Sequence, residues 1–155
     1  MESKSKFLES TMHRLIPITR AMEFTVSECR RDRVVLKAPL APNTNHMGTA
    51  FGGSLNALGM LAGWALLHML LEEQQVQARI LIREGTTSYL TPVKKDFEAI
   101  CEPEHEKLLD QALEALKGKG RASIELAAQI RCGGKVVMRF RGSFVMIAGE
   151  AESGA

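Results

Sequence analysis

The residues best placed for chemistry lie in one segment, 45–71, in which a glycine-rich loop runs directly into a long apolar stretch. Gly52 and Gly53 stand at the junction, where the missing side chains let backbone N–H groups approach a ligand closely. The first N–H groups of a helix have no intrahelical partner and lie at the positive end of its dipole. Together with the side-chain amide of Asn45, they would stabilise negative charge that develops on a carbonyl oxygen.

The apolar stretch also limits the chemistry, because it carries no Asp or Glu before Glu72. Glu72 lies about 18 residues into the expected helix, roughly 27 Å from its start, and cannot serve a carbonyl bound there in the same subunit. Apolar side chains are expected to wall the site: Met47, Phe51, Leu58 and Met60.

The surrounding elements follow from hydrophobic spacing and from Gly and Pro positions. The pattern predicts a short amphipathic helix at 4–15, strands at 22–28 and 33–38, a loop at 40–53, a long buried helix at 54–74, strands at 78–82, 86–91 and 96–101, a polar helix at 104–117, and strands at 123–131 and 135–147. One long helix covered by a single curled antiparallel sheet is an α+β fold.

Length and composition favour one globular domain, 1–155, with its core at about 22–147 and a flexible tail at 148–155. The formal net charge is +2 and no run alternates aromatic with basic residues, so we expect no nucleic-acid partner. The apolar residues 55–71 approach the length of a membrane span. Asn56, His68 and the glycines favour a helix buried inside a sheet instead, so no membrane span is expected.

The three cysteines, Cys29, Cys101 and Cys132, are far apart in the sequence and form no CxxC pair. No His stands at ligand spacing from them, so the sequence predicts neither a disulfide framework nor a zinc site. The N-terminal residues lack the apolar segment of a secretory signal. Reduced thiols and no such signal together indicate a cytoplasmic protein.

Several motifs resemble those of the hot-dog fold of acyl-thioester enzymes, over roughly residues 22–147. Asn45, Gly48 and the run Phe51-Gly52-Gly53-Ser54-Leu55 stand where many such thioesterases carry an Asn or His, a Gly, and a His-Gly-Gly. The run Tyr89-Leu90-Thr91-Pro92-Val93 is similar to a strand that ends in Pro-Val. With its helical insert before Gly120-Arg121-Ala122, the chain looks like a stand-alone form of the thioesterase domain fused to some bacterial acetyltransferase domains, whose relatives include malonyl-acyl-carrier-protein decarboxylases.

The resemblance implies a homodimer or a dimer of dimers, with active sites between subunits and a phosphopantetheine arm entering from the surface. The substrate would be a thioester of acyl carrier protein or of coenzyme A, and no metal or redox cofactor is expected. The candidate catalytic residues are Asn45, Gly53 and His46. The candidate substrate-binding residues are Phe51, Gly52, Ser54, Asn56, Met47, Met60 and Tyr89.

Three functions remain open at this point. Many hot-dog hydrolases place an Asp or Glu where this chain has Leu58-Gly59-Met60-Leu61, which favours a reaction that needs no carboxylate. The leading hypothesis is decarboxylation of malonyl-acyl carrier protein to the acetyl form, which primes fatty acid synthesis, because an apolar pocket with oxyanion donors suffices for it. Hydrolysis of acyl thioesters, with His46 as base, is the close alternative, and a non-catalytic acyl-binding module is the third.

Several of these residues also have structural interpretations. Ser54 is equally suited to be the N-cap of the long helix, and Asn56 to hold a buried polar cluster. Gly59 and Gly63 favour close packing of the helix against a neighbour, and His68 lies too far along the helix to act at its start. Basic residues form solvated faces that would also suit an acidic carrier protein or phosphates: Lys94, Lys95, Lys117, Lys119 and Arg121.

Overall fold

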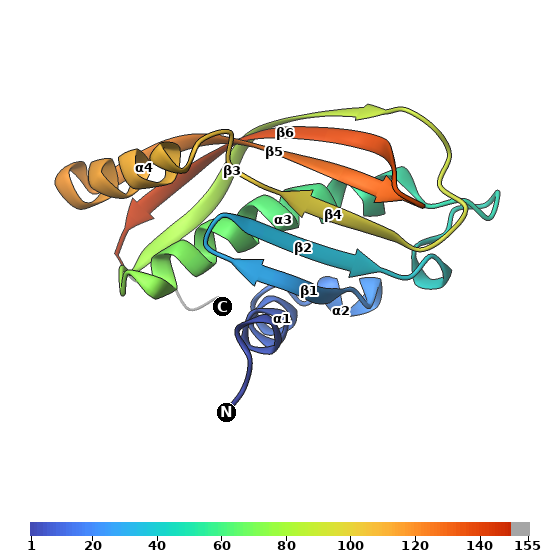
Figure 1. Cartoon of the computed structure of the whole chain (residues 1–155), viewed down its shortest axis with the longest axis horizontal. Coiled ribbons are helices and arrows are strands. Elements are labelled where there is room, and N and C mark those ends of the chain that lie inside the picture. Colours follow the sequence, from blue (N-terminus) through green and yellow to red (C-terminus); the bar gives the residue numbers. More distant parts are fainter. Residues whose placement is uncertain (150–155) are drawn as a thin grey trace.

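The computed structural model describes residues 1–149 and has one six-stranded sheet curved around a long central helix (Figure 1). The elements in chain order are α1 (Lys4–Leu15), α2 (Thr19–Met22), β1 (Thr25–Arg30), β2 (Arg33–Ala38), the 3-10 turn η1 (Ala41–Asn43), α3 (Gly52–Glu73), β3 (Ala78–Tyr89), β4 (Phe97–Cys101), α4 (Glu106–Lys119), β5 (Arg121–Cys132) and β6 (Lys135–Ala148). Of the tail expected at 148–155, residue 148 ends β6 and residues 150–155 lie outside the described part of the chain.

The strand order in the sheet is β1-β2-β4-β5-β6-β3, and neighbouring strands pair antiparallel. β5 alternates exposed and buried residues along its length, as expected for a strand with one face on the core and one in solvent. β1 and β3 form the two edges. At the β1 edge the carboxylate of Glu9 in α1 accepts a hydrogen bond from the backbone N–H of Val26 at 2.9 Å.

α3 lies across the concave face of the sheet and supplies much of the core (Figure 1). Twelve of its 22 residues are buried, Gly59 and Gly63 among them. A Cβ on Gly59 would lie 3.0 Å from the Cβ of Phe140, and one on Gly63 would lie 2.7 Å from the ring of Phe144. The prediction that these glycines permit close packing is therefore confirmed. α3 is long and apolar enough to cross a membrane, but 67% of its most apolar window is buried in the fold.

Two helical segments flank this core. The hydroxyl of Ser3 caps α1 by accepting from the N–H of Lys6 at 3.2 Å, and α1 packs Leu8 and Met12 into the core. α4 buries one apolar stripe that includes Leu109 and Leu116, and it ends at Gly120, whose φ of 74° suits a glycine. Both segments therefore use one face for packing and leave the other in solvent.

The structure corrects four predicted boundaries. α3 begins at Gly52, because the carbonyl of Phe51 accepts from the N–H groups of Ser54 and Leu55, so Phe51 is the N-cap and Ser54 is not. Met22 ends the short helix α2 instead of starting a strand. The two strands expected at 78–82 and 86–91 are one strand, β3, because a bulge between Ile82 and Glu84 absorbs the extra residue without ending the pairing with β6. The helix expected at 104–117 runs two residues later at both ends.

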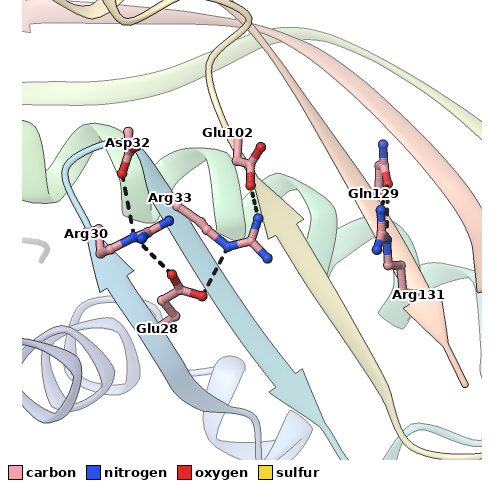
Figure 2. A network of polar contacts seen from close by, with 7 residues as sticks. All are labelled: Glu28, Arg30, Asp32, Arg33, Glu102, Gln129 and Arg131. Atoms are coloured by element: carbon pink, nitrogen blue, oxygen red, sulfur yellow. Dashed lines mark hydrogen bonds and ion pairs between the residues drawn. The ribbon is translucent and has the colours of Figure 1, made fainter. Parts of the chain in front are cut away.

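The outer face of the sheet carries a network of paired charges (Figure 2). Glu28 on β1 contacts both Arg30 and Arg33 at 3.0 Å, and Arg33 also contacts Glu102 beyond the end of β4. Glu28 and Arg33 are partly exposed, and ion pairs at a protein surface contribute about 0–1 kcal/mol each. Because these charges satisfy one another, the network is best explained as a solvated outer face.

Candidate functional site

A cavity of about 440 Å³ opens beside the first turns of α3. One wall comes from α3 and from the loop before it, and the other from the corner between α1 and α2. The lining residues are Ile16, Ile18, Ala21, Met22, Pro42, Asn43, Phe51, Gly53, Ser54, Asn56, Ala57, Met60 and Leu61. Most of these side chains are apolar and none is charged, so the cavity suits a neutral, largely hydrocarbon group.

The start of α3 supplies hydrogen-bond donors at the edge of this cavity. The N–H of Phe51 donates to the carbonyl of Asn43 at 2.7 Å, and those of Ser54 and Leu55 donate to the carbonyl of Phe51. Within residues 1–149 the N–H groups of Gly52 and Gly53 have no acceptor. Because Gly53 also lines the cavity, the two amides form a short donor pair at the positive end of α3, suited to an oxyanion.

The side chain of Phe51 lies against Gly53. A Cβ placed on Gly53 would lie 2.3 Å from Cε2 of the Phe51 ring, so the ring occupies the space beside that glycine. Phe51 is 55% exposed and is not one of the buried core residues. Only a glycine at position 53 permits this close approach.

Two hydrogen bonds fix the first turn of α3 against β3. The hydroxyl of Tyr89 donates to the carbonyl of Gly52 at 2.9 Å, and the hydroxyl of Thr87 donates to Oδ1 of Asn56. Asn56 thus keeps its Nδ2 group free of any partner among the described residues. A smaller cavity, of about 180 Å³, shares Asn56 and Met60 with the larger one and is otherwise lined by Ile82, Arg83, Glu84, Gly85 and Phe140.

Asn45 lies in the loop before α3, and its side chain bonds to that loop. Oδ1 accepts from the N–H groups of Met47 at 2.8 Å and Thr49 at 3.2 Å, while Nδ2 donates to the hydroxyl of Thr49 at 2.8 Å. His46 and Met47 are exposed. Asn45, His46 and Met47 are not among the residues that line the cavity beside α3. Their proposed roles in catalysis and binding therefore stay predictions.

Five of the ten candidate residues line the larger cavity together, namely Phe51, Gly53, Ser54, Asn56 and Met60. Gly52 and Tyr89 adjoin it through their mutual hydrogen bond.

Asn43 is a residue that the sequence reasoning missed. It is only 2% exposed and lines the cavity. Its Nδ2 donates to the carbonyl of Met22 at 2.9 Å and to that of Pro39 at 2.8 Å. It therefore ties α2, the loop and the start of α3 together. The sequence offers a faint signal for it, an Asn after a Pro in a loop, but that pattern is equally typical of turns.

Titratable groups are scarce around this site. Glu84 is the one carboxylate that lines either cavity within residues 1–149. Burial raises the pKa of the Cys101 thiol to about 12, which excludes it as a thiolate nucleophile near neutral pH. Within the same residues no three His, Cys, Asp or Glu side chains gather to hold a metal ion. The arrangement is therefore one of amide donors facing an apolar cavity.

Comparison with known proteins identifies a matching family and similar solved structures. Residues 5–148 match the family described as "Putative thioesterase (yiiD_Cterm)". A protein of unknown function from Chlorobaculum tepidum is 28% identical with a TM-score of 0.86, covering 94% of this chain and 94% of that one. A "putative thioesterase" from Shewanella oneidensis is 26% identical with a TM-score of 0.79, covering 92% of this chain and 96% of that one.

A thioesterase from Haemophilus influenzae is 15% identical with a TM-score of 0.75, covering 99% of this chain and 97% of that one. At that identity the likeness shows the fold alone. The α+β hot-dog fold expected from the sequence is confirmed by these structures and by the sheet wrapped around α3.

Proposed function

The chain belongs to the family described as "Putative thioesterase (yiiD_Cterm)", and from this premise we propose that it hydrolyses acyl thioesters. The observation that carries the proposal is the pair of amides of Gly52 and Gly53, which have no acceptor among residues 1–149 and lie at the edge of an apolar cavity. A thioester has the two parts that such a site requires, a carbonyl oxygen that becomes negative during attack and a hydrocarbon chain. We rank hydrolysis above decarboxylation, although the sequence alone favours decarboxylation. The reason is that the family and the Shewanella relative are thioesterase-like.

In this proposal the substrate carbonyl oxygen accepts from the N–H groups of Gly52 and Gly53. Loss of one such donor costs an acyl-transfer enzyme about 10²–10³ in rate. Water adds to the carbonyl carbon and gives up a proton to a base, the oxyanion collapses with cleavage of the C–S bond, and the thiolate leaves and takes up that proton. Asn56 has a free Nδ2 group between the two cavities and is suited to hold either the oxyanion or the water.

Water activation requires a proton acceptor, and Glu84 is our candidate for it. It follows the bulge in β3 and lines the smaller cavity beside Asn56. Bulges next to active sites often redirect a side chain toward the ligand. His46 is the alternative from the sequence, and it is the second choice because it is not among the residues that line either cavity.

Decarboxylation of a malonyl thioester is the second candidate function. It is favoured by one specific observation, the lack of any charged residue among those that line the larger cavity. An uncharged pocket disfavours the bound malonyl carboxylate and so favours its loss as carbon dioxide. The same two amides would hold the resulting enolate, so this reaction needs no general base. Its product on a carrier protein would prime fatty acid synthesis.

The thioester carrier is either acyl carrier protein or coenzyme A. The N–H of Ala50 donates to the carbonyl of Val93 at 2.8 Å, which brings the exposed Lys94 and Lys95 close to the loop before α3. Both carriers present negative charge, and basic side chains near the site would attract it. Arg121, by contrast, pairs with the end of β6 near the start of β3, and so lies toward the end of α3, far from the cavity.

We propose a homodimer, or a dimer of such dimers, that forms through β3. This edge strand has 12 residues and lines the smaller cavity. Two of its apolar side chains are about half exposed, Leu81 at 52% and Tyr89 at 55%. A long edge strand with exposed apolar side chains is a ready template for pairing with a second chain. A partner there would lie beside the smaller cavity and exclude water from it. A cytoplasmic location also stays a proposal, supported by the three free thiols.

The experiment that tests the function is an assay of separate products. Purified protein is incubated with acyl-coenzyme A esters, acyl-carrier protein and malonyl-carrier protein, and free thiol, free acid and acetyl thioester are each quantified. Release of thiol with an equal amount of acid supports hydrolysis. Acetyl thioester without thiol release would overturn hydrolysis in favour of decarboxylation. No turnover of any thioester would overturn both reactions and favour the non-catalytic acyl-binding module.

A further inference from the structure

We propose that the corner between α1 and α2 selects the length of the acyl chain. This inference rests on the proposed function, because it assigns a role to one wall of the same cavity. Four residues of the corner line that wall: Ile16, Ile18, Ala21 and Met22. They come from a different part of the chain than the start of α3 and line the same cavity as Gly53. A thioester carbonyl at Gly53 would therefore direct its hydrocarbon chain toward the corner.

The corner is held rigidly, as a specificity wall must be. The hydroxyl of Thr19, a residue with no exposed surface, donates to the carbonyl of Ile16 at 2.7 Å. His13 of α1 connects the start of α2 to the start of β1. Its Nδ1 lies 2.9 Å from the Thr19 hydroxyl, and its Nε2 lies 3.2 Å from the carbonyl of Phe24. Asn43 completes the set by donating to the carbonyl of Met22. These contacts fix the corner to both the sheet and the loop before α3.

The apolar side chains of the corner do not all serve the core. Met22 is 7% exposed and packs inward, whereas Ile18 is 74% exposed although it borders the cavity. Ile18 therefore keeps apolar surface that a ligand in the cavity can contact. A hydrocarbon chain in the cavity would cover part of Ile18 and gain about 0.8 kcal/mol for each buried CH₂.

Two substitutions at exposed positions test this wall without removing core contacts. Ala21→Phe fills the cavity from the α2 side, and we expect kcat/KM for long-chain acyl-coenzyme A esters to fall about 10- to 100-fold, with the acetyl ester changing less than about 2-fold. Ile18→Ala removes part of the wall, and we expect a loss of about 3- to 10-fold for long chains only. Leu15→Ala is the matched control, because Leu15 is 48% exposed on the same corner but does not line the cavity.

A second readout separates this inference from the proposed reaction. Binding of dansyl-labelled undecanoic acid is measured for each variant, together with its oligomeric state by light scattering. If the native protein turns over no thioester, the proposed reaction fails, yet weaker probe binding in Ala21→Phe would still support the acyl wall. An unchanged chain-length profile and unchanged probe binding would overturn it. A changed oligomeric state with an unchanged profile would also overturn it and assign the corner to a second copy of the chain.

Discussion

The side-chain amide of Asn45 donates to the hydroxyl of Thr49 at 2.8 Å, inside the loop that leads into α3. The Oδ1 atom of Asn45 also accepts hydrogen bonds from two backbone N–H groups of the same loop. Asn45 therefore closes a turn of five residues just before the donor pair of Gly52 and Gly53. Asn45 can therefore influence the site through the shape of this loop as well as through its own amide.

Replacing Asn45 by Ala removes three hydrogen bonds from this loop. We expect activity to fall by two to three orders of magnitude if its amide contacts the oxyanion, an effect of about 3–4 kcal/mol. If Asn45 acts only by shaping the loop, Thr49→Val should reproduce part of the loss, because it breaks one of the three bonds, from Nδ2 to the Thr49 hydroxyl, and leaves the amide in place. Kinetics and thermal unfolding of both variants separate the two roles. Full activity of Asn45→Ala would remove this residue from the site.

Glu84→Gln tests the proton acceptor for hydrolysis. The substitution keeps the size of the side chain and removes its basic group, so we expect kcat for thiol release to fall about 10²- to 10⁴-fold. Decarboxylation of a malonyl thioester needs no such base and should persist. Glu114→Gln makes the same chemical change on the exposed face of α4 and serves as the control. Unchanged hydrolysis in Glu84→Gln would transfer the role to another group, with His46→Ala the next variant to assay.

Leu81→Arg tests the proposed dimer through β3. Leu81 is 52% exposed on this edge strand, so the folded monomer should tolerate arginine there. Two arginines brought together across a pair of edges would repel, and such charges are how natural edge strands avoid pairing. We expect light scattering to show a shift from dimer to monomer. Phe7→Arg, at a residue 39% exposed on α1, is the control, and a dimer that survives Leu81→Arg would place the interface elsewhere.

His68 predicts a pH dependence of stability. Burial lowers the pKa of its imidazole, with Glu72 opposing this shift and Arg14 adding to it, and the ring stacks on Trp64 at 4.7 Å. Above about pH 7 both the folded and the unfolded ring are neutral. As the pH falls through about 6.5, the unfolded chain binds a proton before the folded one does, so the free energy of unfolding decreases.

The measurement is urea unfolding at pH 8 and pH 5.5 for the native protein and His68→Phe. The phenylalanine keeps an aromatic ring against Trp64 and removes the titration. We expect a smaller loss of stability at pH 5.5 in the variant than in the native protein. His105→Gln, at the exposed N-cap of α4, should leave the difference unchanged. An equal loss in His68→Phe would show that other groups cause the acid sensitivity.

Much of this fold follows from the sequence because its signals are strong and local. The long apolar run predicts a buried helix, and Gly59 and Gly63 predict its close contact with the sheet. The errors arise where tertiary pairing overrides local preference. Two glycines enter the first turn of α3 because the Phe51 carbonyl caps it, and the polar residues Arg83 and Glu84 remain in β3 because a bulge keeps the pairing with β6.

The candidate site is less predictable, because its two walls come from distant parts of the chain. Gly53, Asn56 and Met60 follow from the segment around the start of α3. Ile18 and Asn43 could not be identified, because an apolar residue near a helix end and an Asn in a loop have many ordinary explanations. Only the folded arrangement shows that Asn43 joins α2 to the loop before α3.

The central claim is that the amides of Gly52 and Gly53 bind the substrate carbonyl. It is tested most directly by ¹⁵N NMR of the protein titrated with a ketone analogue of an acyl-coenzyme A ester, in which a CH₂ group replaces the sulfur. We expect saturable shifts of both amide resonances, and a smaller shift of the residue-53 amide in Gly53→Ala, whose Cβ competes with the Phe51 ring for space. Saturable binding that leaves both glycine resonances unmoved would contradict it.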